Sequence, residues 1–437
     1  MSATVTDRDG FLQNLRLSKL LSKEQLRQAQ ERVRNAQDAE EAATILTRGK
    51  FITAFQAKML LRGRNSGYFL GPYRVLDQLG QGGMGRVYKA IHETMNRIVA
   101  LKVLSPQVVD SDRARELFLH EVQAAARLNH PNIVIAFDYN EIEGRHYFAM
   151  EYVDGPNLDR YVKDRGPLPI GLACEIVFQA ANGLQHAHSK AMVHRDIKPA
   201  NLLLQHDNDS PTVQVKILDF GLARLGAPKK SEGRRDRVMG TPDYLSPEQS
   251  RDMSLVDIRS DLYSLGCTFY FLLTGEVPFP GGGILQKLAR HNDEIARPVE
   301  ELRSDVPPKV AAIVRRLMEK DPDARFQTPD DLMDALAPYA APAGMDWPIA
   351  APASFTPSPG RSGEEQLLLT QAAEDTEPKA LASTEITDEE SILEWADAQS
   401  KERRFMRRLM LAALAGGALL LTLGAAAGAA AWWWMGQ

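Results

Sequence analysis

Three polar residues lie close together in the segment HRDIKPAN, residues 194–201. Asp196 stands two positions before Lys198 and five before Asn201, so a compact loop can bring their side chains to one point. A carboxylate can orient or deprotonate an attacking hydroxyl. A lysine can neutralise the charge of a transferring phosphoryl group, and an amide oxygen can bind a divalent metal. A plain polar turn would not require this combination, so the segment predicts phosphoryl chemistry.

A second metal ligand is predicted in KILDFGLAR, residues 216–224. Asp219 follows a short apolar run that is typical of a strand. Carboxylate oxygens are the hard ligands that Mg²⁺ prefers. Together with Asn201, Asp219 therefore predicts a Mg²⁺ site, with Mn²⁺ as the alternative ion.

A glycine-rich segment, LGQGGMGRVYKA, lies between two strand-like runs at residues 79–90. Glycine has no Cβ, so its backbone amides can approach phosphate oxygens. The spacing alone is weak evidence because hairpins often contain glycine. A dinucleotide-binding loop would open a long helix, and the strand-like RVYKA excludes that reading. The predicted phosphate-contacting positions are Gly80, Gln81, Gly82, Gly83, Met84 and Gly85, with Val87 as an apolar cover over a bound base.

A lysine interrupts the apolar run VALKVL, residues 99–104. On a strand, Lys102 would point to the face opposite Leu101 and Val103. There it would either reach phosphates or extend its amine to the surface. The sequence around Lys102 does not distinguish these two roles. Glu121 follows nineteen positions later in a predicted helix. It is suitably placed to pair with the lysine, although glutamates are also common on exposed helix faces.

Taken together, these segments resemble the motifs of the eukaryotic-like Ser/Thr protein kinases, of the membrane-anchored bacterial type. The glycine-rich loop, VALK, the helix glutamate, HRDIKPAN, DFG and SPE occur in the expected order within residues 73–339. The resemblance implies an α+β protein kinase fold of two lobes, the N-lobe rich in β-strands and the C-lobe helical.

The same resemblance implies a role for each matching residue. Asp196 would be the catalytic base, with Lys198 beside it. Lys102 would hold the α- and β-phosphates of ATP, with Glu121 as its ion-pair partner. The other implied positions are Ala100, Glu151 and Val153 for ATP, and Asn201 and Asp219 for Mg²⁺.

Further implied features concern substrate class and stability. Lys198 in DIKPAN and Thr241 in GTPDYLSPE agree with the Ser/Thr class, so proteins bearing Ser or Thr hydroxyls are the expected substrates. Asp261 is expected as a buried helix anchor. Arg325 is expected to pair with Glu248, and breaking a buried ion pair costs about 3–5 kcal/mol.

The predicted activation loop departs from the family pattern. Arg195 is typical of kinases that are switched by phosphorylation in this loop. Between residues 221 and 240, however, Ser231 is the only hydroxyl residue, and the basic run KKSEGRRDR replaces the usual threonines. Either Ser231 is the switch, or control by this loop is weak or comes from dimer contacts.

An N-terminal helical module is predicted over residues 1–71. Apolar residues recur at helical spacing from Phe11, and Ser22 with Gln25 resembles a capping box. This module is expected to dock a partner or to regulate the kinase.

A tether and a membrane span are predicted after the kinase domain. Residues 340–400 form a Pro/Ala-rich and then acidic linker. The basic segment 401–408 precedes residues 409–434, which contain no charged side chain and are long enough to cross a bilayer. The positive flank predicts a single-pass protein of the cell membrane whose kinase domain faces the cytoplasm. The small residues of GAAAG could pair two such helices, and the kinase domain is a second candidate surface for self-association.

Composition argues against other classes. A formal net charge of -5 gives no general case for nucleic-acid binding. Cys174 and Cys267 are the only cysteines and lie far apart, which argues against a zinc site or a disulfide framework. The rival to a kinase is a catalytically silent signalling scaffold of kinase fold. The protein substrate, the stimulus and the oligomeric state are not determined by the sequence.

Overall fold

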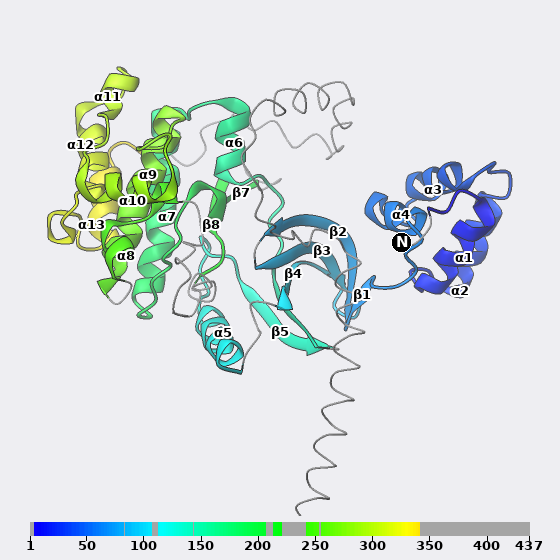
Figure 1. Ribbon diagram of the computed structural model, residues 1–437. Coiled ribbons are helices and arrows are strands. Elements are labelled where there is room, and N and C mark those ends of the chain that lie inside the picture. The colour runs from blue at the N-terminus through cyan, green and yellow to red at the C-terminus, as the bar shows by residue number, and fades with distance from the viewer. Residues whose placement is uncertain are drawn as a thin grey trace, which may run out of the picture. The chain divides into compact units, whose positions relative to one another are not determined.

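The computed structural model describes residues 4–82, 84–106, 112–142, 144–206, 213–220, 242–252 and 255–340 (Figure 1). Four short helices come first, and the predicted capping box of Ser22 and Gln25 is confirmed. They are α1 (Arg8–Ser18), α2 (Lys23–Arg32), α3 (Ala39–Arg48) and α4 (Ala54–Leu61). Phe11, Leu15, Leu46 and Leu60 are buried in a hydrophobic cluster that these helices share. The helical module therefore has a core of its own.

A six-stranded antiparallel sheet follows, as the alternating runs predict. Its strand order is β1-β2-β3-β4-β6-β5. The strands are β1 (Phe69–Leu70), β2 (Tyr73–Gly82), β3 (Gly85–His92), β4 (Arg97–Leu104), β5 (Ala136–Ile142) and β6 (Arg145–Glu151). Alternate residues of β4 enter different clusters: Val99 and Leu101 pack on one face, while Ala100 packs with Phe118 of helix α5 (Asp112–Ala125) on the other. The period of two thus aims Lys102 toward the α5 side.

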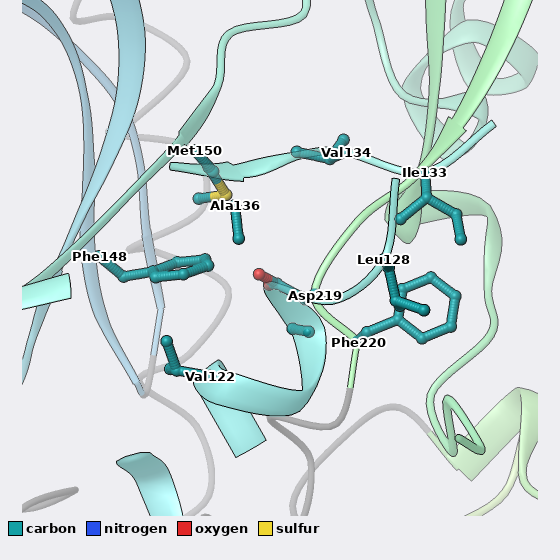
Figure 2. Close-up of a pocket in the computed structure, with 10 residues that line it drawn as sticks. Val122, Leu128, Ile133, Val134, Ala136, Phe148, Met150, Asp219 and Phe220 are labelled. Atoms are coloured by element: carbon teal, nitrogen blue, oxygen red, sulfur yellow. The ribbon is translucent and has the colours of Figure 1, made fainter. Parts of the chain in front are cut away.

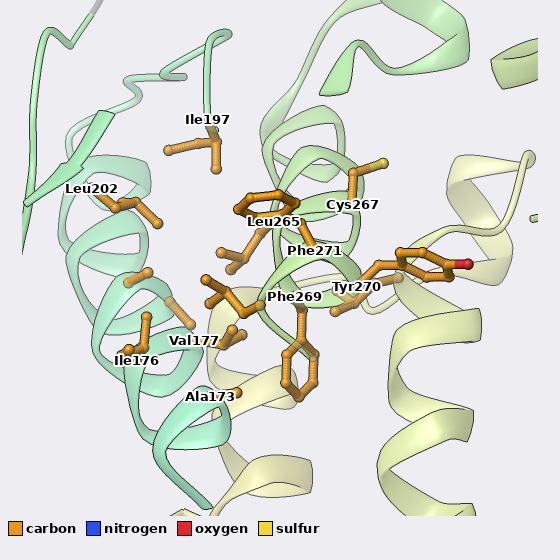
Figure 3. Close-up of a cluster of buried hydrophobic side chains, with 14 of the residues drawn as sticks. Ala173, Ile176, Val177, Ile197, Leu202, Leu265, Cys267, Phe269, Tyr270 and Phe271 are labelled. Atoms are coloured by element: carbon orange, nitrogen blue, oxygen red, sulfur yellow. The ribbon is translucent and has the colours of Figure 1, made fainter. Parts of the chain in front are cut away.

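Helices dominate the rest of the domain. They are α6 (Leu158–Arg165), α7 (Ile170–His188), α8 (Pro247–Arg251), α9 (Ile258–Thr274), α10 (Ile284–Asp293), α11 (Val299–Leu302), α12 (Pro308–Leu317) and α13 (Pro329–Leu336), with a hairpin of β7 (Leu202–His206) and β8 (Val213–Ile217). Figure 3 shows Ile176 and Val177 of α7 facing Leu265 and Phe269 of α9. Helix α9 is buried nearly all round, its polar residues Ser260, Asp261, Ser264 and Thr268 included, so it forms the centre of this lobe.

The two expected buried anchors are confirmed. Asp261 is 0% exposed and accepts the backbone N–H groups of His194 and Arg195, each at 2.7 Å. Arg325 is also 0% exposed and donates to both carboxylate oxygens of Glu248, at 2.7 and 2.9 Å. Burial by itself raises the pKa of Glu248, but the Arg325 guanidinium outweighs burial, so the pKa falls below its ordinary value.

His291 predicts a pH dependence of stability. It is fully buried on α10, and its Nδ1 lies 2.9 Å from the Tyr263 hydroxyl. Burial, with Lys320 nearby, lowers the pKa of His291 from 6.5 to about 4. Since the folded state disfavours protonation, this contribution to stability is present above pH 6.5 and lost as the pH falls toward 4. The melting temperature should therefore fall between about pH 7 and pH 5, and less steeply in His291→Gln. Equal slopes in the two proteins would assign the effect to other groups.

Several predicted features lie outside the described residues. These are Gly83, the loop with Ser231 and Thr241, the linker 340–400 apart from its first residue, the basic segment 401–408 and the run 409–434. Among the helices that the structure describes, none is long and apolar enough to cross a membrane.

Candidate active site

The structure brings together the three polar residues of the HRDIKPAN segment. Lys198 Nζ donates to both carboxylate oxygens of Asp196, at 2.9 and 2.7 Å. The side-chain amide of Asn201 donates to the Asp196 backbone oxygen at 2.8 Å and to its Oδ2 at 3.0 Å. The short helix Pro199–Asn201 begins directly after Lys198, which folds the loop back on itself. Asp196 is thereby held in one place while its side chain stays 37% exposed.

The loop is anchored from behind by His194, which is 0% exposed. Its Nδ1 accepts the Asp196 N–H at 3.1 Å, so Nε2 carries the proton and donates to the Leu218 carbonyl at 2.6 Å. The imidazole also meets the edge of the Phe220 ring, with centroids 4.7 Å apart. One buried side chain therefore joins the Asp196 loop to the segment that carries Asp219.

Asp219 follows β8 with φ 59°, a left-handed conformation that is uncommon for a residue other than glycine. Its Oδ2 accepts a hydrogen bond from Lys102 Nζ at 2.7 Å. Lys102 is only 5% exposed, so the interpretation of a surface lysine is wrong. The partner implied by the resemblance, Glu121, lies in α5, but its side chain is outside the described part of the structure. That pairing stays a prediction.

The second carboxylate oxygen of Asp219 tests the fit of a metal ion. Oδ1 is buried and has no hydrogen-bond partner among the described residues. Buried polar atoms are rarely left in this state without an ion, a water or a ligand. The amide nitrogen of Asn201 is engaged with Asp196, which leaves its oxygen as a neutral acceptor. A carboxylate and an amide oxygen suit a hard cation such as Mg²⁺.

The glycines of the β2–β3 turn divide into two kinds. An added Cβ on Gly85 would lie 2.0 Å from the Val103 oxygen, and φ is +138°, so the fold itself requires glycine there. An added Cβ on Gly80 or Gly82 would meet nothing within 4 Å, and neither has a positive φ. Close approach of a ligand to the backbone, rather than packing, would explain those two glycines.

The remaining predicted positions lie on neighbouring strands. Gln81 pairs with Arg86 and Val87 pairs with Lys102 in the sheet, and the Met84 oxygen accepts from Ser105 N–H at 2.9 Å. Val87 packs against the cluster that contains Ala100 and Met150, while Val153 is buried just beyond β6.

A cavity of about 20 Å³ lies beside Asp219. Figure 2 shows the Asp219 carboxylate directed toward Phe148, with Phe220 beside Leu128. The other lining residues are apolar side chains of α5, β5 and β6 and of the segments beside them.

Sequence reasoning missed an ion pair at the end of β6. Glu151 Oε1 lies 2.9 Å from Lys216 Nζ, and Lys216 is only 5% exposed. Glu151 Oε2 also accepts from the Ile135 N–H at 3.2 Å. This side chain therefore ties β6 to β8, whereas the resemblance implies mostly backbone contacts at Glu151. The sequence around Lys216 does not indicate that this lysine pairs with a glutamate 65 positions away.

Known proteins are similar to this chain over the region that contains these residues. The family model described as protein kinase domain matches residues 73–336. Serine/threonine-protein kinase PknB of Mycobacterium leprae is 40% identical over 260 residues, 59% of this chain and 41% of that protein. Serine/threonine-protein kinase PrkC of Bacillus subtilis is 35% identical over 262 residues, 60% of this chain and 39% of that protein. The chain thus spans about two fifths of the length of these curated relatives.

A solved structure shows the same fold. A double mutant of the PknI kinase domain from Mycobacterium tuberculosis is 30% identical, covers 63% of this chain and 98% of that chain, and has a TM-score of 0.51. The family match covers more than half of the residues, and it contains both the Asp196 loop and the Lys102–Asp219 pair. The chain therefore belongs to the protein kinase family.

Proposed function

We propose that this chain is a Ser/Thr protein kinase that transfers the γ-phosphate of ATP to Ser or Thr hydroxyls of proteins. The observation that carries the proposal is one connected cluster: the Asp196 loop, joined through His194 to the segment of Asp219, which in turn binds Lys102. The printed names of the relatives as serine/threonine kinases support the same class.

Each residue has a defined part in the proposed reaction. Asp196 accepts the proton of the substrate hydroxyl while the hydroxyl oxygen bonds to the γ-phosphorus of ATP. The bond between the γ-phosphorus and the bridging oxygen breaks, and that oxygen leaves with ADP. Lys198, already 2.7 Å from Asp196, balances the charge that builds on the transferring group. Lys102 orients the α- and β-phosphates. When bound, Mg²⁺ would neutralise the phosphates, held by Asn201 and Asp219. Gly80 and Gly82 leave room for the phosphates at the backbone.

The test is transfer of labelled γ-phosphate by the purified full-length chain. Mg²⁺, a generic basic protein and phosphoamino-acid analysis complete the assay, with a chelator as the control. Label on Ser or Thr that needs the metal is expected. No label with either Mg²⁺ or Mn²⁺, even with enforced dimers, would favour the silent scaffold. In that case Lys102→Met should leave signalling in cells unchanged.

We further propose that residues 409–434 anchor the kinase domain at the cytoplasmic side of the cell membrane. The support is the uncharged run behind the basic segment 401–408. Pairing of these helices through GAAAG would bring two kinase domains together. A tag at Met1 should survive protease added outside intact cells. Cleavage of the tag would contradict the proposed orientation, because it would place the kinase domain outside the cell.

A further inference from the structure

Two side chains of the helical module donate hydrogen bonds to the strand that leads into the glycine-rich loop. Thr53 Oγ1 donates to the Leu76 oxygen at 2.6 Å, and Gln56 Nε2 donates to the Val75 oxygen at 2.7 Å. Gln56 is only 1% exposed. The Gln56 bond is buried and the Thr53 bond is part-buried. Loss of the Gln56 donor would leave a buried carbonyl without its partner, which is costly.

The same two residues form the capping box of α4. Thr53 Oγ1 accepts the Gln56 N–H at 3.2 Å, and Gln56 Oε1 accepts the Thr53 N–H at 3.0 Å. Each side chain therefore uses its acceptor on the helix and its donor on β2. The start of α4 and the path of β2 are fixed by one set of four hydrogen bonds.

The two carbonyls are those of an irregular stretch of β2. The pairing of β2 with β3 shifts between Val75 and Asp77, so Leu76 lies at a bulge. In a regular strand, consecutive carbonyls point to opposite edges, whereas here Val75 and Leu76 both reach the helical module. The shift skips Leu76, which has no Cα partner in β3, whereas Val75 stays paired with Ala90. Thr53 binds the carbonyl of the skipped residue and Gln56 binds that of the residue before it.

A third contact reaches the next strand. Phe55, between the two donors, meets the Tyr88 ring of β3 edge-on, with centroids 6.3 Å apart. Tyr88 pairs with Gln78, which follows the bulge in β2. The module thus holds both strands on whose ends the glycine-rich turn is built.

We propose that Thr53 and Gln56 are positioning residues for the glycine-rich loop, acting through the bulge at Leu76. Gly80 lies four residues beyond Leu76, about 13 Å along a strand. Release of the two carbonyls would let the bulge shift and would displace Gly80 and Gly82 from the phosphates. The role at ATP rests on the proposed kinase function, while the effect on β2 does not.

The test uses Gln56→Glu and Thr53→Asp in the full-length chain. Aspartate at the N-cap, position 53, and glutamate at the third helical position, position 56, both keep the capping acceptor of α4. Neither carboxylate has a donor for the carbonyls of β2. The KM for ATP should rise about fivefold, which corresponds to the net free energy of one typical hydrogen bond. The KM for protein substrate should stay unchanged. Amide exchange in residues 73–82 should become faster. Thr53→Ser, which keeps the hydroxyl, should behave as wild type.

Lys58→Ala, an exposed position on α4, is the matched control. Amide exchange in α1 to α4 reports whether the module stays folded in each variant. If the module is folded and both the KM for ATP and exchange in β2 match this control, the proposal is wrong. If the wild type transfers no phosphate, the kinase proposal fails, and exchange in β2 still decides the positioning role.

Discussion

Asp196→Asn is expected to lower kcat for phosphoryl transfer by about 10²–10⁴-fold, the range typical of losing a general base. The amide has nearly the same shape but cannot accept the proton of the substrate hydroxyl. Its hydrogen bonds with Lys198 and Asn201 are partly kept, so the loop should hold its form. Single-turnover transfer of labelled phosphate measures the effect, and ATP affinity, measured separately, should change by less than about twofold.

Asp159→Asn is the matched control for this substitution. Asp159 also pairs with a lysine, Lys163, at 2.9 Å, but on α6, where the Lys163 side chain is 67% exposed and that of Asp159 is 32% exposed. Its loss should leave transfer unchanged because exposed pairs of this kind contribute little. Transfer by Asp196→Asn within about tenfold of wild type would contradict the role of Asp196 as the base.

Arg325→Met is expected to destabilise the kinase domain by about 3–5 kcal/mol. The guanidinium uses all its N–H groups: besides Glu248 it donates to the carbonyls of Glu319, Arg259 and Lys320. Its removal leaves a buried carboxylate and three carbonyls without their donor. Urea-induced unfolding measures the loss. Activity should fall as well, because Gln249, next to Glu248, donates to the Arg195 oxygen in the Asp196 loop.

Two further variants separate geometry from charge. Arg325→Lys keeps the charge but cannot reach five acceptors, so it should recover only a small part of the lost stability. Arg315→Met removes an arginine that pairs with Glu300 at the surface, and should cost less than about 1 kcal/mol. A loss below about 1 kcal/mol in Arg325→Met would show that the buried pair is not a major anchor.

The sequence by itself determined the local parts of the site. Asp196, Lys198 and Asn201 lie within one short loop, so few conformations are available and their convergence could be predicted. The alternation in β4 indicated a strand, and the capping box of Ser22 and Gln25 indicated a helix start. The buried pair of Arg325 and Glu248 could be named only through the resemblance to a family.

Only the tertiary structure decided the pairings between distant residues. Lys102 binds Asp219, 117 positions away, and Gln56 binds the carbonyl of Val75 at a bulge that no sequence pattern indicates. In an unfolded chain each of these groups has many partners of the same chemistry. Folding removes water from these groups and leaves each of them only a few polar neighbours. A buried charge or carbonyl must then bond to the donor or acceptor that the fold places beside it.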